Sequence, residues 1–216
     1  MSAVPSETFP ALDLPFAKHA FLGRIPGLDV GVGRGEALRR LDEHHAVARR
    51  ELGFGAMPLS TAEQVHGNRV AVVETGPEGP APGCDGIITN TRNITLGVYV
   101  ADCCAIYFLD PVKHAIGLAH SGRKGTELGI ASVAIDALRR HFGSDPADLI
   151  VQLSPCIRPP FYEIDFAAEI VHQCRANGVT HVFDCGKNTA ADLSGYYSYR
   201  AELGKTGRML ALLALI

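Results

Sequence analysis

The stretch ITLGVYVADCCAIYFLD, residues 94–110, indicates most about the fold of this chain. Its two apolar runs, Ile94 to Val100 and Ala105 to Leu109, are rich in β-branched and aromatic residues, which favours two buried strands. Between them stands Ala101-Asp102-Cys103-Cys104, which we predict to be a polar turn at a buried strand end. Adjacent side chains of a strand point to opposite faces, so we do not expect Cys103 and Cys104 to bind one ion, and we expect Cys104 to be a small core residue.

Helices and further strands are predicted on both sides of this stretch. Glu36 to Leu52 and Thr126 to Phe142 carry apolar side chains three or four residues apart and are predicted to be helices, the first ending at Gly53. A third helix should begin at Asp165, a typical N-cap, and end at Asn177-Gly178. Short strands are expected at Val70 to Glu74, Gly86 to Asn90, Ala115 to Ala119, Leu149 to Leu153, Val182-Phe183 and Met209 to Ile216.

This alternation of elements indicates the fold class. Strands and helices alternate only in places, so the pattern favours mixed sheets with outer helices over a pure doubly wound sheet. At 216 residues the chain is long enough for one domain with a substantial core, or for two small ones. Residues 1–20 are rich in proline and are expected to be irregular as far as Ala20-Phe21-Leu22.

Composition argues against several classes of protein. The formal charge of −3 argues against a broad basic nucleic-acid surface, although a few local arginines and lysines suffice to bind a small anion. The six cysteines form no compact disulfide framework, and Met1 to Pro10 lacks the basic and apolar regions of a secretion signal, so we expect reduced thiols and a cytoplasmic location. No apolar run approaches membrane-spanning length, so neither a nucleic acid nor a membrane is expected as a partner.

Three potential metal ligands, His66, Cys103 and His120, each lie at the end of an apolar, strand-like run. Proteins with α/β architecture tend to place ligands and catalysts at strand ends. Two imidazoles and one thiolate suit a borderline-soft ion such as zinc and leave a fourth position open for chemistry. The three residues are far apart in the sequence, so packing or surface roles among the nine histidines and six cysteines are the alternative.

The segment that follows His120 is a candidate phosphate-binding loop. Ser121-Gly122-Arg123-Lys124-Gly125 has glycines that allow close backbone approach, two cations, and a predicted helix after it. The signature spacing of a P-loop is absent. The alternative is a tight strand-to-helix connection with a solvated Arg123–Lys124 pair.

Two carboxylates and several aromatic residues have more than one interpretation. Asp102 is either a partner that orients an imidazole or a solvated turn residue. Asp85 is most simply a turn carboxylate. The side chains expected at the surface are His44, His45 and His114, and those that either stack on a base or form one alternating strand are Tyr196, Tyr197 and Tyr199.

Six motifs, in order along the chain, resemble one known family. They are Gln64-Val65-His66-Gly67, Cys84-Asp85-Gly86, Ala101-Asp102-Cys103, Ala119-His120-Ser121-Gly122, Ser154-Pro155-Cys156-Ile157-Arg158-Pro159, and Tyr197-Ser198-Tyr199-Arg200 followed by Thr206-Gly207-Arg208. From about Arg24 to Ile216 the chain resembles the laccase-domain family, also called multicopper polyphenol oxidase and now regarded as zinc-dependent purine nucleoside phosphorylases. It departs from the family where Ala-Gly-Trp-Arg-Gly is usual after the last ligand histidine, and where Arg158 replaces a glycine.

The resemblance implies a fold, an activity and a set of site residues. The implied fold is a single α+β domain over residues 21–216, a layered sandwich of mixed β-sheets flanked by outer helices. The resemblance also implies that Asp85 borders the site. The implied activity is phosphorolysis of adenosine or inosine to base and ribose 1-phosphate, with adenosine deamination and methylthioadenosine cleavage at the same site. Zinc would be bound by His66, Cys103 and His120, which are also the implied catalytic residues. The expected substrate contacts are Arg24, Arg49, Arg123, Lys124 and Arg200.

Other functions remain open from the sequence. Cys103 is a candidate nucleophile of a cysteine-dependent hydrolase or deamidase, with His120 or His66 as base. Copper-dependent phenol oxidation usually needs many clustered histidines, and the chain contains no His-x-His pair. A binding module that has lost activity is a further alternative, given the departures at Arg123 and Lys124.

Overall fold

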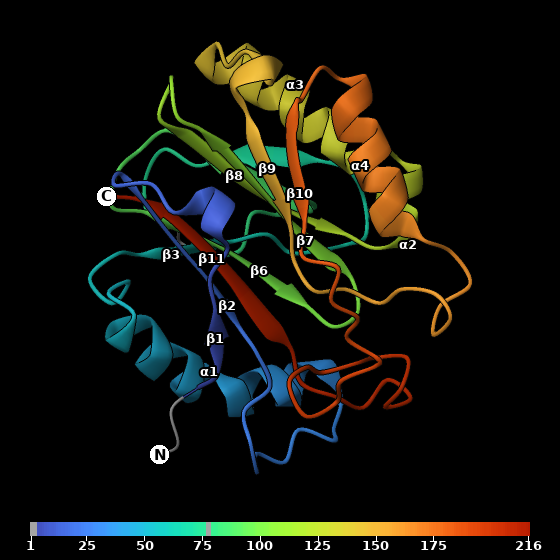
Figure 1. Cartoon of the computed structure of the whole chain (residues 1–216). Helices are drawn as coiled ribbons and strands as arrows, with labels where there is room; N and C mark the ends of the chain where they lie inside the picture. The colour runs from blue at the N-terminus through green and yellow to red at the C-terminus, as the bar shows by residue number, and fades with distance from the viewer. Residues whose placement is uncertain (1–3, 77–78) are drawn as a thin grey trace.

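Two mixed β-sheets stack face to face in the computed structural model, which describes residues 4–76 and 79–216, and helices cover the outer face of each sheet (Figure 1). The first sheet has the strand order β1-β2-β11-β6-β3. In it, β11 pairs antiparallel with both β2 and β6, whereas β3 pairs parallel with β6. Its strands are β1 (Ser6–Glu7), β2 (Ala17–Leu22), β3 (Leu59–Thr61), β6 (Thr95–Val100) and β11 (Met209–Leu215).

The second sheet has the strand order β10-β9-β7-β8-β5-β4. Its four central strands are antiparallel, and a parallel strand is added at each edge. Its strands are β4 (Val70–Val72), β5 (Gly86–Thr89), β7 (Cys104–Asp110), β8 (Ala115–Ser121), β9 (Ile150–Leu153) and β10 (His181–Asp184). The hairpin between β7 and β8 is closed by Asp110, whose carboxylate accepts hydrogen bonds from the amides of Val112 and Lys113.

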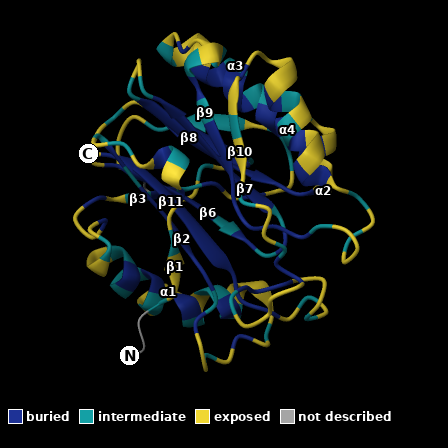
Figure 2. Ribbon diagram, viewed as in Figure 1, coloured by how far each residue is buried: buried dark blue, intermediate teal, exposed yellow. Residues whose placement is uncertain are grey.

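Each sheet contributes one face to a shared core and one face to its own helices. In β7, Tyr107 and Leu109 pack between the sheets, whereas Ile106 and Phe108 pack under the helices of the second sheet. This is why β7 is apolar throughout rather than alternating. The Tyr107 hydroxyl donates to the carbonyl of Ala20, which joins the two sheets across the core. Figure 2 shows the buried strands between the exposed outer sides of the helices.

The helices lie on opposite outer faces. α1 (Arg34–Glu51) packs on the first sheet, and α3 (Ile130–Phe142) and α4 (Phe166–Ala176) pack on the second. The predicted N-cap of α4 is confirmed, because the Asp165 side chain accepts from the amide of Ala168. The remaining helical elements are α2 (Arg123–Glu127), η1 (Pro10–Leu12) and η2 (Pro146–Asp148). No helix among the described residues is long and apolar enough to cross a membrane.

The predicted α+β class, with mixed sheets and outer helices, is confirmed, and the predicted strands lie within a few residues of the observed ones. Three expectations were wrong. Thr126 to Phe142 is not one helix, because Gly129 adopts φ +72° and separates α2 from α3. Residues 1–20 are not irregular throughout, because β1, η1 and most of β2 fall there and bury Leu12. His45 is not at the surface but lies on the inner face of α1 and is 3% exposed.

Candidate metal centre

The fold brings His66, Cys103 and His120 together at one end of the sandwich. His120 lies near the end of β8, Cys103 in the turn between β6 and β7, and His66 in the loop between β3 and β4. One potential ligand atom from each residue lies within 4.8 Å of the other two. The two imidazole rings meet edge to face, with centroids 4.9 Å apart. Both connections, β3 to β4 and β6 to β7, run from one sheet to the other, so the cluster forms where the sheets are joined.

A buried carboxylate, Asp85, fixes two of the three potential ligands. It has no exposed surface and accepts hydrogen bonds from the backbone amides of Val65, His66 and Gly67 at 3.2, 2.8 and 2.7 Å. His66 adopts φ +61°, a left-handed conformation that helps to turn these successive amides toward one carboxylate. The same carboxylate accepts from Nδ1 of His120 at 2.9 Å. Nε2 of His120 is therefore the ring nitrogen that points away from Asp85, and it is the one that would bind a metal after losing its proton.

Gln64 attaches the His66 loop to the first sheet. Its side-chain amide donates to the carbonyl of Tyr99 at 2.6 Å, and its side-chain oxygen accepts from the Tyr99 amide at 3.0 Å. The Gln64 side chain thus satisfies both backbone groups of Tyr99, as the backbone of a neighbouring strand would. The two contacts hold the loop at the end of β6, next to the turn that carries Cys103.

The electrostatics of the cluster favour a thiolate beside an imidazolium. Burial acts to raise the pKa of Cys103, but the charges and hydrogen bonds of His120 and His66 outweigh it and lower the pKa to about 6. Burial acts to lower the pKa of His120, but Cys103 and Asp85 outweigh it and raise the pKa to about 9. A preformed thiolate is both a metal ligand and a nucleophile.

Gly122 leaves the space that the Cys103 sulfur occupies. A Cβ atom at Gly122 would lie 2.5 Å from Sγ of Cys103, which is closer than two such atoms can approach. Gly122 is also the N-cap residue of α2. A glycine is therefore required for close packing here and not for backbone conformation.

Cys104 points away from the cluster, as predicted. It is fully buried among the residues between the second sheet and its helices, and burial raises the pKa of its thiol. The two adjacent cysteines thus differ in chemistry because they face opposite sides of β7.

Four of the five residues predicted to bind substrate contact other groups of the protein, and the fifth, Lys124, has no ion pair within the part of the chain that the structure describes. Arg24 pairs with Glu202 at 2.5 Å and lies over the ring of Tyr197, and Arg49 donates to the carbonyl of Met57. Arg200 pairs with Glu163 at 2.5 Å and lies over the ring of Tyr162.

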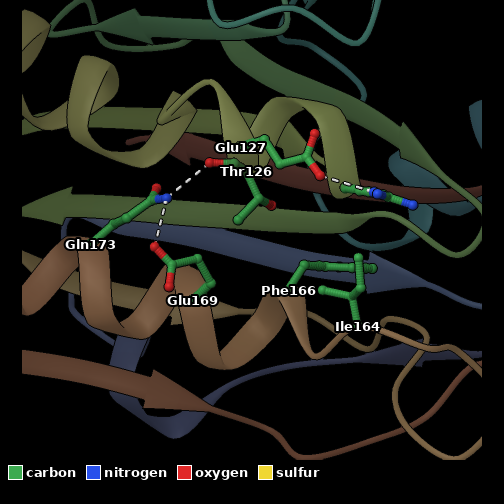
Figure 3. A pocket seen from close by; sticks show the side chains of 7 residues that line it. Thr126, Glu127, Ile164, Phe166, Glu169 and Gln173 are labelled. Carbon is green, nitrogen blue, oxygen red and sulfur yellow. Dashed lines mark hydrogen bonds and ion pairs between the residues drawn. The ribbon is translucent and has the colours of Figure 1, made fainter.

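The loop cations Arg123 and Lys124 are exposed at the start of α2. Arg123 pairs with Glu127 at 2.9 Å and borders a pocket of about 270 Å³ between α2 and α4. Figure 3 shows Glu127 and Thr126 on one side of this pocket and Glu169 and Gln173 on the other. None of the three clustered ligands lines it.

The roles of the two carboxylates differ from the expectation. Asp102 orients no imidazole: its oxygens accept from the hydroxyl of Thr189 and the backbone amide of Arg200, each at 2.7 Å. Asp85 does so instead. Two signals for Asp85 were present in the sequence: an acidic residue immediately before an apolar strand, and the motif Cys84-Asp85-Gly86, through which the resemblance places Asp85 at the border of the site. The three tyrosines form no strand, and Tyr197 is fully buried while Tyr199 is 54% exposed.

Known proteins resemble this chain over nearly its whole length. The model of the family described as multi-copper polyphenol oxidoreductase laccase matches residues 21–171 and 162–216. A purine nucleoside phosphorylase of Deinococcus radiodurans is 30% identical over 230 residues, which cover 91% of this chain and 88% of that protein. The purine nucleoside phosphorylase LACC1 of Mus musculus is 42% identical over 105 residues, 49% of this chain but 24% of the mouse protein. The crystal structure of YlmD from Geobacillus stearothermophilus is similar with a TM-score of 0.82 and 25% identity, over 96% of this chain and 94% of that one.

Proposed function

The chain belongs to the multi-copper polyphenol oxidoreductase laccase family, and from this premise we propose that it is a zinc-dependent purine nucleoside phosphorylase. The observation that carries the proposal is the cluster of His66, Cys103 and His120. In this cluster the pKa of Cys103 is lowered, which favours the thiolate, and Asp85 fixes the ring of His120. The names of the relatives support the choice of reaction.

The donor set suits one zinc ion. Two imidazole nitrogens and one thiolate, with a carboxylate behind one imidazole, are typical of zinc sites that keep an open position. When bound there, zinc would supply a Lewis acid at that position. Over residues 4–76 and 79–216 the structure contains one such group of potential ligands, which is too few for several copper ions.

The three residues of the cluster and Asp85 have different tasks in this proposal. His66, Cys103 and His120 hold the metal. Asp85 keeps the proton on Nδ1 of His120, so that Nε2 remains a ligand throughout the reaction. Phosphorolysis then needs an anion held against the sugar and stabilisation of an oxocarbenium-like transition state.

The predicted substrate contacts divide by position. We assign Arg123 and Lys124, exposed next to His120, to the approach of phosphate, and Arg200 to the nucleoside. Arg24 and Arg49 are held by Glu202 and by the carbonyl of Met57, so we assign them to keeping their own segments in place. Deamination of adenosine and cleavage of methylthioadenosine are included in the proposal as further reactions of the same site.

The cysteines support a reducing compartment. All six are free, although Cys104 and Cys156 are both buried in the same cluster. We therefore propose a cytoplasmic location.

A second candidate is a cysteine-dependent hydrolase. The observation that favours it is the sequence of contacts from Cys103 to His120 to Asp85, which is the order of nucleophile, base and orienting carboxylate. In that case the protein would act without metal and would be inactivated by one equivalent of iodoacetamide.

The test is incubation of purified, zinc-loaded protein with adenosine, inosine or methylthioadenosine, with and without phosphate, and separation of the products by chromatography. We expect free base and ribose 1-phosphate only when phosphate is present, and loss of turnover when a chelator removes zinc. Turnover that survives complete metal removal would support the cysteine hydrolase, and absence of base release from every nucleoside would contradict the proposed function.

A further inference from the structure

Arg208 is a buried cation without a carboxylate partner among the described residues. The residue is 9% exposed, and its recorded hydrogen bonds run from Nη1 to the carbonyls of Thr206 and Gly207, at 3.0 and 2.7 Å. Over the described residues, no carboxylate lies within ion-pairing distance of its guanidinium. Buried charges in proteins are normally paired, because an unpaired one loses its hydration without compensation.

Two other arginines of similar burial show the usual arrangement. Arg24 and Arg158 have side chains 21% and 14% exposed, and each has a carboxylate oxygen at 2.5 Å, from Glu202 and Asp184 respectively. Arg208 is more buried than either and has none. Arg208 therefore differs from these two arginines in lacking a carboxylate partner.

The position of Arg208 links it to the metal cluster. It immediately precedes β11, whose Met209 pairs with Val100 at the end of β6, so Arg208 lies beside the turn that carries Asp102 and Cys103. The Cys103 thiolate is one of the charges that act on the guanidinium of Arg208. The Arg208 guanidinium carbon lies 5.9 Å from the ring centroid of Tyr199, an exposed residue.

A second cation, Arg34, is exposed at the start of α1 and acts on the same guanidinium. Its charge lowers the pKa of Arg208, after the larger effect of burial. Arg34 donates to the carbonyl of Glu63, next to the Gln64–Gly67 loop that carries His66. Two neighbouring guanidinium groups repel each other, and an anion between them removes that repulsion.

Asp102 is the one carboxylate among the charges that raise the pKa of Arg208, and its effect is the smallest. Its oxygens accept from the hydroxyl of Thr189 and the amide of Arg200 instead. The other anion, the Cys103 thiolate, is assigned to the metal in the proposed function, so neither of them is left as a partner for Arg208.

We propose that Arg208 and Arg34 bind an oxyanion beside the His66–Cys103–His120 cluster, and that this oxyanion is free inorganic phosphate. Binding of an oxyanion follows from the unpaired cations alone; naming it as the phosphate co-substrate rests on the proposed function. Arg123 and Lys124, which are exposed and in the case of Arg123 already paired, would attract phosphate only at the rim. Arg208 is the inner contact.

The test measures phosphate binding directly, so that it does not depend on turnover. Zinc-loaded wild-type protein, Arg208→Gln, Arg208→Lys and Arg34→Gln are titrated with inorganic phosphate by calorimetry. The matched control is Arg139→Gln, which removes a positive charge from the exposed, Asp136-paired side of α3. We expect the phosphate Kd to rise at least tenfold in Arg208→Gln, less in Arg208→Lys and Arg34→Gln, and to stay unchanged in the control. Zinc content should be equal in all five proteins, because none of the replaced residues is a ligand.

A second measurement separates a binding role from a structural one. In phosphate-free buffer the Tm of Arg208→Gln should be no lower than that of the wild type, because an uncompensated buried charge is removed. Added phosphate should raise the Tm of the wild type and of Arg139→Gln, but not that of Arg208→Gln. A structural arginine would give the reverse: a lower Tm without phosphate and an unaltered response to it.

The outcomes distinguish this inference from the proposed function. Phosphate binding that depends on Arg208, in a protein that releases no base, would support the inference and contradict the phosphorylase. Phosphate-dependent base release with the same phosphate KM in wild type and Arg208→Gln would support the phosphorylase and overturn the inference. Tight binding of adenosine 5′-monophosphate without binding of free phosphate would overturn the assignment of the anion.

Discussion

Asp85 remains ionised inside the protein because four donors share its charge. Burial acts to raise its pKa, but His120 and the amides of Gly67 and His66 outweigh burial and hold the pKa below its usual value. The carboxylate thus joins the loop that carries one potential ligand to the ring of another. Its effect on the metal is indirect, through the position of His66 and His120.

We predict that Asp85→Asn lowers zinc affinity by about 10–100-fold, the range found when the partner of a metal-binding imidazole is replaced. Zinc competition with a chromophoric chelator measures this. The control is Asp110→Asn, which removes an equally buried carboxylate with two backbone donors at the far end of β7. Asp110→Asn should lower stability without changing zinc affinity; equal zinc affinities of wild type and Asp85→Asn would show that Asp85 does not orient the ligands.

The adjacent cysteines provide a second prediction at this scale. Cys103→Ala should lose bound zinc and activity together, whereas Cys104→Ala should keep both and lose roughly 1 kcal/mol of stability through the small cavity. Metal analysis of the purified variants decides the matter. Full zinc occupancy in Cys103→Ala, or loss of zinc from Cys104→Ala, would show that Cys103 is not the cysteine that binds zinc.

At the residue scale, the sequence identified what depends on local alternation and missed what depends on pairing across the fold. The opposite faces of Cys103 and Cys104 follow from strand geometry and were predicted. Which carboxylate meets which imidazole depends on the pairing of β5 with β8, which places Asp85 beside His120. The residues around Asp85 and Asp102 in the sequence do not indicate how β5 and β8 are paired.

Among the elements, the connection between β8 and α3 shapes the site most directly. The interruption at Gly129 makes α2 a separate short helix, and its N-cap Gly122 lies against the Cys103 sulfur. The apolar periodicity that predicted one helix lies in α3, because α2 has the sequence RKGTE. A single glycine with positive φ is compatible with that periodicity, so the interruption could not be read from it.

We predict that Gly122→Ala displaces the Cys103 thiol and lowers zinc affinity, because the new methyl group would occupy the position of the sulfur. The control is Gly129→Ala, where no atom lies within 4 Å of the new Cβ but φ is +72°. That change should lower the free energy of unfolding by roughly 1–2 kcal/mol through backbone strain and leave zinc affinity unaltered. Zinc titrations and denaturant unfolding of both variants test the pair, and unchanged zinc affinity in Gly122→Ala would contradict the packing argument.

Helix α1 carries a buried titratable group on its inner face. Both ring nitrogens of His45 lack hydrogen-bond partners within the described structure, and burial, with a smaller effect of His44, lowers its pKa to about 4 from 6.5. The folded state therefore binds this proton less readily than the unfolded state does. Its contribution to stability is present above pH 6.5 and is lost as the pH falls toward 4.

We predict that the free energy of unfolding falls between pH 7 and pH 4 by up to about 3 kcal/mol on account of His45, the value that its pKa difference implies. His45→Leu should reduce this fall, whereas His141→Leu, at the exposed end of α3, should not. Denaturant unfolding at a series of pH values provides the comparison. Parallel pH profiles for wild type and His45→Leu would contradict the prediction.

At the scale of the whole molecule, the metal cluster lies where the chain passes between the two sheets. The connections from β3 to β4 and from β6 to β7 contribute His66 and Cys103, and β8 contributes His120. A metal ion bound there would tie the two sheets together at one end.

We predict that zinc raises the Tm and that a chelator reverses the increase. An ion that binds the folded state alone stabilises it by about 2.7 kcal/mol when its free concentration is 100 times its Kd. Cys103→Ala should remove the zinc response without removing the transition itself. A thermal unfolding series at increasing zinc concentration tests this, and a Tm independent of zinc would show that the ion contributes nothing to the joint between the sheets.

The sequence predicted the composition of the sandwich better than its arrangement. Apolar runs such as 104–110 and 209–215 indicated strands buried on both faces, which is what two stacked sheets under helices require. The pairing of β2 with β11 joins residues from opposite ends of the chain, and β3 is too short to show a period. Both were missed because strand order is set by packing between distant segments rather than by local preference.

The central position of β11 has a consequence for synthesis. β11 is the last described strand along the chain, yet β2 and β6 both pair with it. His66, Cys103 and His120 all leave the ribosome before it, so translation delivers the potential metal ligands well ahead of the strand that closes the first sheet. Until β11 emerges, the nascent chain presents the unpaired edges of β2 and β6, and such edges associate with other chains. The interval between the last potential ligand and the last strand is therefore the stage of synthesis at which these edges are open to association.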